Sequence, residues 1–113
     1  MIEQRNDKTD FLYQVEPYSR ILNVLRDGEQ NGIHLKDLIT ITGFQDRELR
    51  KLIEFIRRNG VVIIADNSGY YFPSDISELR SYLKRQESRA KSTYYTLSTA
   101  KNLESKLNKI LPS

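Results

Sequence analysis

The amino-acid sequence predicts an α+β fold that is mostly helical, with one β-hairpin and a helical extension at its C-terminal end. Three observations support this class. Apolar residues recur at helical spacing in three segments of the first half of the chain. A run of β-branched residues, a cluster of turn formers and an aromatic run then follow in the order of a hairpin. A capping signal after the hairpin opens a further helical region. The length of 113 residues fits one domain with extensions.

Residues 1–16 are predicted to form an arm that precedes the domain. The first ten residues are polar, and a short apolar group follows: Phe11, Leu12, Tyr13 and Val15. Two placements are open for this group, docking on the domain or pairing as a short edge strand. Pro17 breaks whatever precedes it, so the domain is predicted to begin there.

The first helix of the domain is predicted over residues 17–28. Proline suits a first helical position, and one face carries Ile21, Leu22 and Leu25. Gly28 tolerates left-handed backbone and is expected to end the helix. Ile33 and His34 then predict a very short strand, in which His34 is expected to have a structural role.

Two further helices are separated by a tight turn. The first spans residues 35–42 and the second residues 47–59, because each carries apolar residues at i, i+3, i+4 and i+7. Those positions are Leu35, Leu38, Ile39 and Thr42, then Leu49, Leu52, Ile53 and Ile56. Gly43 stops the shorter helix, Phe44 and Gln45 make the turn, and Asp46 is predicted to cap the longer one. Gly60 closes it.

A β-hairpin is predicted next. Residues 61–65 are consecutive apolar residues, mostly β-branched, and indicate a strand. Residues 66–69 are turn formers and predict a four-residue loop. Residues 70–72 form an aromatic strand that Pro73 ends, since proline cannot donate to a ladder.

Residues 75–113 are predicted to be a helical extension, capped by Ser74 or Asp75. One or two helices are possible, and a break near Leu97-Ser98 is favoured. Two partners are open for this region. In the first case its basic residues would contact DNA phosphates. In the second its apolar ends would pair with a second copy of the chain. Such an interface would be short, because Gln86 and Ala90 interrupt the heptad pattern. Tyr94 and Tyr95 are expected to pack in such a helix interface.

The order of these elements resembles the winged helix-turn-helix superfamily. A short helix that ends at Gly43 and a longer one that starts near Asp46 is the helix-turn-helix arrangement. The resemblance covers residues 18–74 within a domain predicted at 17–74, and its best stretch is LKDLITITGFQDRELRKLIEFIRRNGVVIIADNSGYYF. This stretch is similar to biotin-repressor-like regulator domains and to small phage and mobile-element proteins. The resemblance implies three helices, a hairpin wing and binding to double-stranded DNA.

The helix at residues 47–59 is the predicted reading element. With its apolar face inward, Arg47, Arg50 and Lys51 share the opposite face with Glu54. A helix fits the major groove, so Arg47 and Arg50 are expected at guanine edges and Lys51 and Arg57 at phosphates. The hairpin tip has one acidic and no basic residue, which weakens a minor-groove role. The candidate DNA-contacting residues are Lys36, Gln45, Arg47, Arg50, Lys51, Arg57, Asn67 and Ser68.

Composition narrows the function classes. The chain has no cysteine and a single histidine, which weighs against thiolate sites, zinc sites and a histidine-based triad. No phosphate-loop or nucleophile motif is present, so we expect no enzyme activity, catalytic residue, metal, cofactor or small-molecule ligand. No segment is apolar enough for a membrane, and a cytoplasmic protein is expected. A DNA-binding regulator is the first hypothesis. The alternatives are a protein-interaction module or a replication or excision factor of a mobile element.

Overall fold

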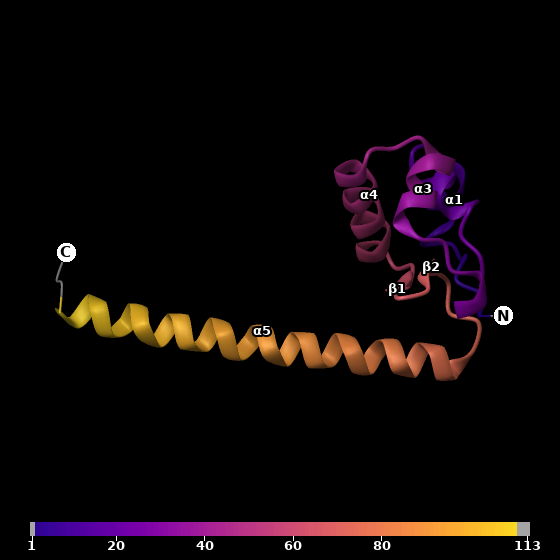
Figure 1. Ribbon diagram of the computed structural model, residues 1–113. Coiled ribbons are helices and arrows are strands. Elements are labelled where there is room, and N and C mark those ends of the chain that lie inside the picture. Colours follow the sequence, from indigo (N-terminus) through magenta and orange to yellow (C-terminus); the bar gives the residue numbers. More distant parts are fainter. Residues whose placement is uncertain (1, 111–113) are drawn as a thin grey trace. The chain divides into compact units, whose positions relative to one another are not determined.

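The computed structural model describes residues 2–110, and it is α+β and mostly helical (Figure 1). The chain divides into two compact units at Leu79/Arg80. The first unit holds most of the elements, and the described part of the second unit, residues 80–110, is helical. In chain order the elements are α1 (Asp10–Gln14), α2 (Tyr18–Leu22), η1 (Glu29–Asn31), α3 (Leu35–Thr42), α4 (Asp46–Arg58), β1 (Ile64–Asp66), β2 (Gly69–Tyr71) and α5 (Ile76–Ile110).

The N-terminal segment belongs to the first unit. Its apolar group forms α1, which packs against α2, and Leu12 is fully buried. The Gln4 side-chain amide donates to the Val62 carbonyl at 2.9 Å, and the Val62 N–H donates to Gln4 Oε1 at 2.7 Å. The segment therefore docks as a helix, and the edge-strand alternative is wrong.

The first predicted helix is shorter than expected. It was predicted over residues 17–28, but α2 ends at Leu22, and Pro17 occupies its N-cap position. The reason lies in the residues that follow, which are hydrogen-bonded to the end of the hairpin. The Phe72 N–H donates to the Arg26 carbonyl, and the Gly28 N–H donates to the Phe72 carbonyl, each at 2.8 Å. Backbone committed to this long-range pairing cannot continue a helix.

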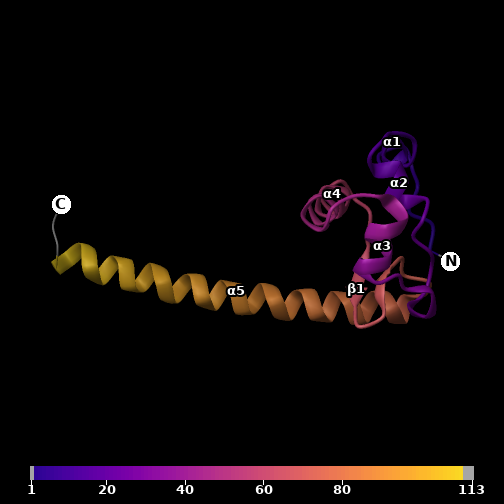
Figure 2. The same cartoon turned by 45° about the horizontal axis from the view of Figure 1, so that its top comes forward.

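The next two helices form nearly as predicted. The α3 bounds match, and Gly43 ends the helix in a left-handed conformation with φ of 80°. The predicted cap at Asp46 is wrong, because Gln45 holds the N-cap position and Asp46 is the first residue of α4. In Figure 2, α2 and α3 both lie against one side of α4.

The hairpin is shorter and tighter than predicted. Ile64 pairs with Tyr71 and Asp66 with Gly69, so the turn has two residues rather than four. Residues 61–63 are not paired as strand, because Gln4 and α4 occupy their backbone groups instead.

A third segment joins the hairpin at its aromatic strand. The predicted strand at Ile33 is a single antiparallel bridge to Tyr70, with N···O distances of 3.0 and 2.8 Å. The backbones meet closely enough that two glycines are required. A Cβ on Gly69 would lie 2.5 Å from the Ile33 carbonyl carbon, and one on Gly32 would lie 2.0 Å from the Ser68 carbonyl oxygen.

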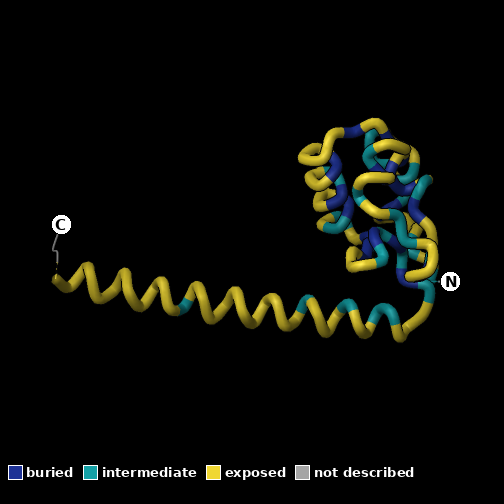
Figure 3. The backbone as a smooth tube through the Cα atoms, viewed as in Figure 1, coloured by how far each residue is buried: buried dark blue, intermediate teal, exposed yellow. Residues whose placement is uncertain are grey.

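The core of the first unit lies between the helices and the hairpin (Figure 3). Its fully buried residues come from α1, α2, α3, α4 and the segment before β1, and they include Leu12, Ile21, Leu38, Leu49, Ile53, Ile56 and Ile63. Phe44, from the turn before α4, is buried with them. This packing fixes α4 against its neighbours and leaves the opposite face of α4 exposed.

The last helix is continuous. It was expected to break near Leu97-Ser98, but α5 runs from Ile76 to Ile110 without interruption. No glycine or proline lies in this range, and serine costs little within a helix. The Thr99 hydroxyl donates to the Tyr95 carbonyl at 3.0 Å, which is a bond compatible with the helix. Tyr94 and Tyr95 are both exposed. Of the helices within residues 2–110, none combines the length and apolar character that a membrane crossing requires.

The Glu78 carboxylate ties the first turn of α5 to the segment around η1. One oxygen accepts bonds from the Ser74 N–H and hydroxyl, and the other accepts the Glu29 N–H, all at 2.8 Å. Burial raises the pKa of Glu78, but these donors outweigh burial and hold its pKa below the ordinary value.

We therefore expect Glu78→Gln to lower the free energy of unfolding by about 1–2 kcal/mol at pH 7. Because the folded-state pKa is lowered, this contribution is present above the ordinary value of 4.5 and is lost as pH falls through the folded pKa. Urea unfolding of both chains at pH 7 and pH 3 measures the difference. An equal gap at both values would contradict an ionised carboxylate as its source.

Candidate nucleic-acid interface

Two basic side chains form the centre of the exposed face of α4. Arg47 and Lys51 are one helical turn apart, both exposed, and neither has an ion-pair partner among residues 2–110. Two open hollows in the surface meet at this pair, because both are lined by Arg47 and Lys51. The first is completed by Arg50, Glu54, Phe55 and Arg58, and the second by Gly43, Gln45, Glu48 and Leu52. Sequence reasoning placed both residues here.

The neighbouring charges on α4 are paired within the helix. Arg50 donates through Nε to Asp46, and Arg58 donates to Glu54 at 3.2 Å, each four residues apart. The hydrogen bond to the Asp46 carboxylate holds the pKa of Arg50 above its ordinary value. Both pairs are exposed, so each contributes little to stability and opens readily for a competing anion.

Arg20 fixes the turn that leads into α4, and the sequence analysis did not identify it. From α2, its Nη1 donates to the Thr42 carbonyl at the end of α3 at 3.1 Å. Its guanidinium also lies 4.6 Å from the centre of the Phe44 ring, and Glu16 pairs with it at 3.1 Å. A cation at a helix C-terminus is favourable, so Arg20 stabilises the angle between α3 and α4.

An aromatic pair borders the basic side chains and was also missed. Tyr18 stacks on Phe55 with ring centroids 4.7 Å apart, and Phe55 lines the hollow that contains Arg47 and Lys51. Phe55 is outside the i, i+3, i+4, i+7 pattern of α4, so periodicity alone placed it with the polar residues. The signal available in the sequence was an aromatic residue off the apolar face of the helix, next to charged residues.

Arg57 does not join this surface. Its Nε and Nη2 both donate to the Ile63 carbonyl, at 3.0 and 2.8 Å, and the residue is half-buried. Through these two bonds Arg57 holds the chain between α4 and β1, and its predicted phosphate contact stays a prediction.

The remaining candidates are dispersed over the first unit, and all but Ser68 are exposed. Lys36 lies in the first turn of α3 and Gln45 at the N-cap of α4, both with exposed side chains. Asn67 is exposed at the hairpin turn, whereas the half-buried Ser68 donates to Glu29 Oε1 at 3.2 Å. His34, expected to be structural, has an exposed side chain and contributes its carbonyl to the first turn of α3.

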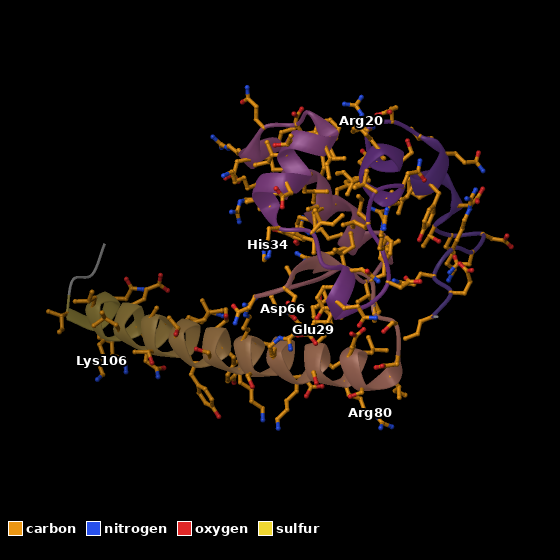
Figure 4. All side chains as sticks on the ribbon, turned by 45° about the vertical axis from the view of Figure 1, so that its right-hand side comes forward. Arg20, Glu29, His34, Asp66, Arg80 and Lys106 are labelled. Atoms are coloured by element: carbon orange, nitrogen blue, oxygen red, sulfur yellow. The ribbon has the colours of Figure 1, made fainter. Side chains whose placement is uncertain are left out.

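The hairpin end of the first unit is acidic. Figure 4 places Glu29 and Asp66 together at this end and Arg20 at the other. Burial raises the pKa of the Tyr71 hydroxyl above its usual range, and its hydrogen bond to the Asp66 carboxylate adds to the effect. Carboxylates therefore gather at the hairpin end, whereas cations that are unpaired within the described chain lie on α4.

Within residues 2–110, no three histidine, aspartate or glutamate side chains gather as a metal site would require. Comparison of the chain with protein-family models, with curated proteins and with solved structures found no match.

Proposed function

We propose that the chain binds double-stranded DNA as a winged helix-turn-helix protein, with α4 in the major groove. In this proposal α3, the Gly43–Gln45 turn and α4 are the helix-turn-helix, and β1–β2 is the wing. The observation that carries it is the exposed Arg47–Lys51 pair on a helix fixed by the core. Cations without an internal partner do not have to give up an ion pair when they meet phosphate or a guanine edge.

The early residues of α4 would read the groove, because the first turns of such a helix meet base edges. Arg47 and Gln45 lie there. Lys51 would contact phosphate, and Lys36 would do so from the first turn of α3. Arg50 would exchange the Asp46 carboxylate for DNA. Phe55 is an apolar neighbour suited to a thymine methyl or a sugar.

The wing has a smaller part in this proposal. Its acidic surroundings disfavour phosphate, and Ser68 is already bonded to Glu29. Asn67 is the predicted wing contact with an exposed side chain, whereas Ser68 and Arg57 would reach DNA alongside the hydrogen bonds that they already make. A regulator of transcription is the use we favour, with replication or excision as the alternative within DNA binding.

The test is fluorescence anisotropy with a random-sequence DNA duplex at low and at physiological salt. We expect weak binding whose logarithm falls linearly with the logarithm of salt concentration, by about 0.9 for each phosphate neutralised. At least two phosphate contacts are expected, from Lys51 and Lys36, and they give a slope of about −1.8 or steeper. Absence of binding at low salt would overturn the proposal.

A second candidate function is a protein-interaction module. The observation that favours it is the charge of the first unit, because residues 1–79 carry ten basic and thirteen acidic groups. A surface of net negative charge suits a basic protein partner better than a polyanion. Binding to a protein partner, together with no salt-dependent binding to DNA, would favour this candidate.

A further inference from the structure

Helix α5 carries an apolar stripe whose large side chains are exposed. No residue of α5 is buried, and the stripe includes six large side chains that are 47–71% exposed. They are Ile76, Leu83, Leu97, Leu103, Leu107 and Ile110. A helix owes most of its stability to the packing of such a face, so a continuous helix of 35 residues requires something to cover it.

The stripe has the spacing of a coiled-coil seam. From Ile76 it advances in alternating steps of three and four residues, through Leu79, Leu83, Gln86, Ala90, Thr93 and Leu97. In the sequence, Gln86 and Ala90 argued against a long coiled coil. Because the helix is unbroken, both residues lie on the same face as the apolar seam residues. The stripe continues through Ala100, Leu103, Leu107 and Ile110 after one additional step of three. A single step of this kind overwinds a coiled coil locally and does not end it.

Charge is excluded from the stripe. Residues 76–110 include eight basic and three acidic side chains, and none of the eleven falls on a stripe position. Arg80 and Lys106, for example, project from the helix outside the stripe (Figure 4). A face that only met water would not sort its charges in this way.

We propose that α5 pairs with α5 of a second copy of this chain, in a parallel, in-register coiled coil. If roughly 100 Å² of apolar surface is covered on each large seam residue, two copies bury on the order of 1,200 Å², the lower end of the range for specific interfaces. The same stripe on both helices gives the self-complementary surface that a two-fold dimer needs.

The polar seam residue Gln86 determines the direction, because Thr93 is the central seam position and meets Thr93 of the other copy in either direction. In a parallel pair Gln86 meets Gln86 and Thr93 meets Thr93 of the other copy, so each polar group finds a hydrogen-bonding partner. In an antiparallel pair that matches the seam end to end, Gln86 would face Ala100 and remain unsatisfied. The positions on either side of the seam also fit the parallel pair. There Glu87 of one copy lies beside Tyr82 of the other, and Arg89 lies beside Tyr94, so no like charges face each other.

The full-length chain tests the pairing in sedimentation equilibrium without DNA. We expect a mass of twice 13.3 kDa, and a monomer mass for Leu83→Glu with Leu97→Glu, which places two charges on the seam. The matched control is Ser88→Glu with Asn102→Glu, which has the same spacing outside the seam and is expected to remain dimeric. A monomer for the unaltered chain, or equal masses for the two variants, would overturn the proposal.

The absence of cysteine allows a direct test of direction. Under mild oxidation, Ala100→Cys is expected to form a disulfide-linked dimer, and Asn102→Cys is not. A link that forms only when Ala100→Cys is mixed with Gln86→Cys would establish the antiparallel pair and overturn the parallel one. Both experiments omit DNA, so their outcome is independent of the proposed function.

Discussion

Replacing Arg47 and Lys51 together by alanine is expected to weaken binding to a selected DNA duplex by about 10- to 100-fold, since such contacts contribute about 1–3 kcal/mol. Both side chains are exposed and unpaired within the described chain, so their removal costs the fold little. Loss of a phosphate contact would also make the salt dependence shallower, by about one unit of slope for Lys51. Fluorescence anisotropy at several salt concentrations measures both effects.

The control removes the same charge elsewhere. Lys8 and Arg26 are also exposed and outside α4, and Lys8→Ala with Arg26→Ala is expected to change affinity by less than about threefold, the size of a general charge effect. If the two double variants lost affinity equally, net charge rather than the α4 surface would account for binding. Circular dichroism of each variant confirms that the fold is retained.

Replacing Leu12 by alanine is expected to lower the free energy of unfolding by about 2–5 kcal/mol, the range for a fully buried leucine. Leu12 is completely buried although it lies in the segment that precedes the predicted domain. The neighbouring Phe11 is 43% exposed, so Phe11→Ala is expected to cost less than about 1 kcal/mol. Urea unfolding of the two variants gives both values. A mild effect of Leu12→Ala would mean that α1 does not pack on the domain in solution.

The elements that depend on local periodicity were predictable from sequence. The α3 bounds matched, and α4 was displaced by one residue, because their apolar spacing and the stop at Gly43 are local signals. The exposed basic face of α4 followed from the same spacing. Its core residues Leu49, Ile53 and Ile56 are all buried.

The features that depend on contacts between distant residues were not predictable. Gln4 bonds Val62 across 58 residues, and the pairing of Arg26 and Gly28 with Phe72 keeps the predicted helix from reaching Gly28. The role of Arg57 also depends on such a contact. Its position on the helix resembles that of a solvent-facing cation, and only the chain path after Gly60 brings the Ile63 carbonyl within reach. The continuity of α5 was missed for the opposite reason, since a weak local signal at Ser98 was given too much weight.

The close approach of Gly32 and Gly69 has a consequence for how this sequence is able to diverge. A side chain on either glycine would collide with backbone of the other segment, which has no alternative rotamer to adopt. The two positions are 37 residues apart, yet a change at one cannot be compensated by a smaller residue at the other, because both are already glycine. Descendants of this chain should therefore inherit the two glycines together.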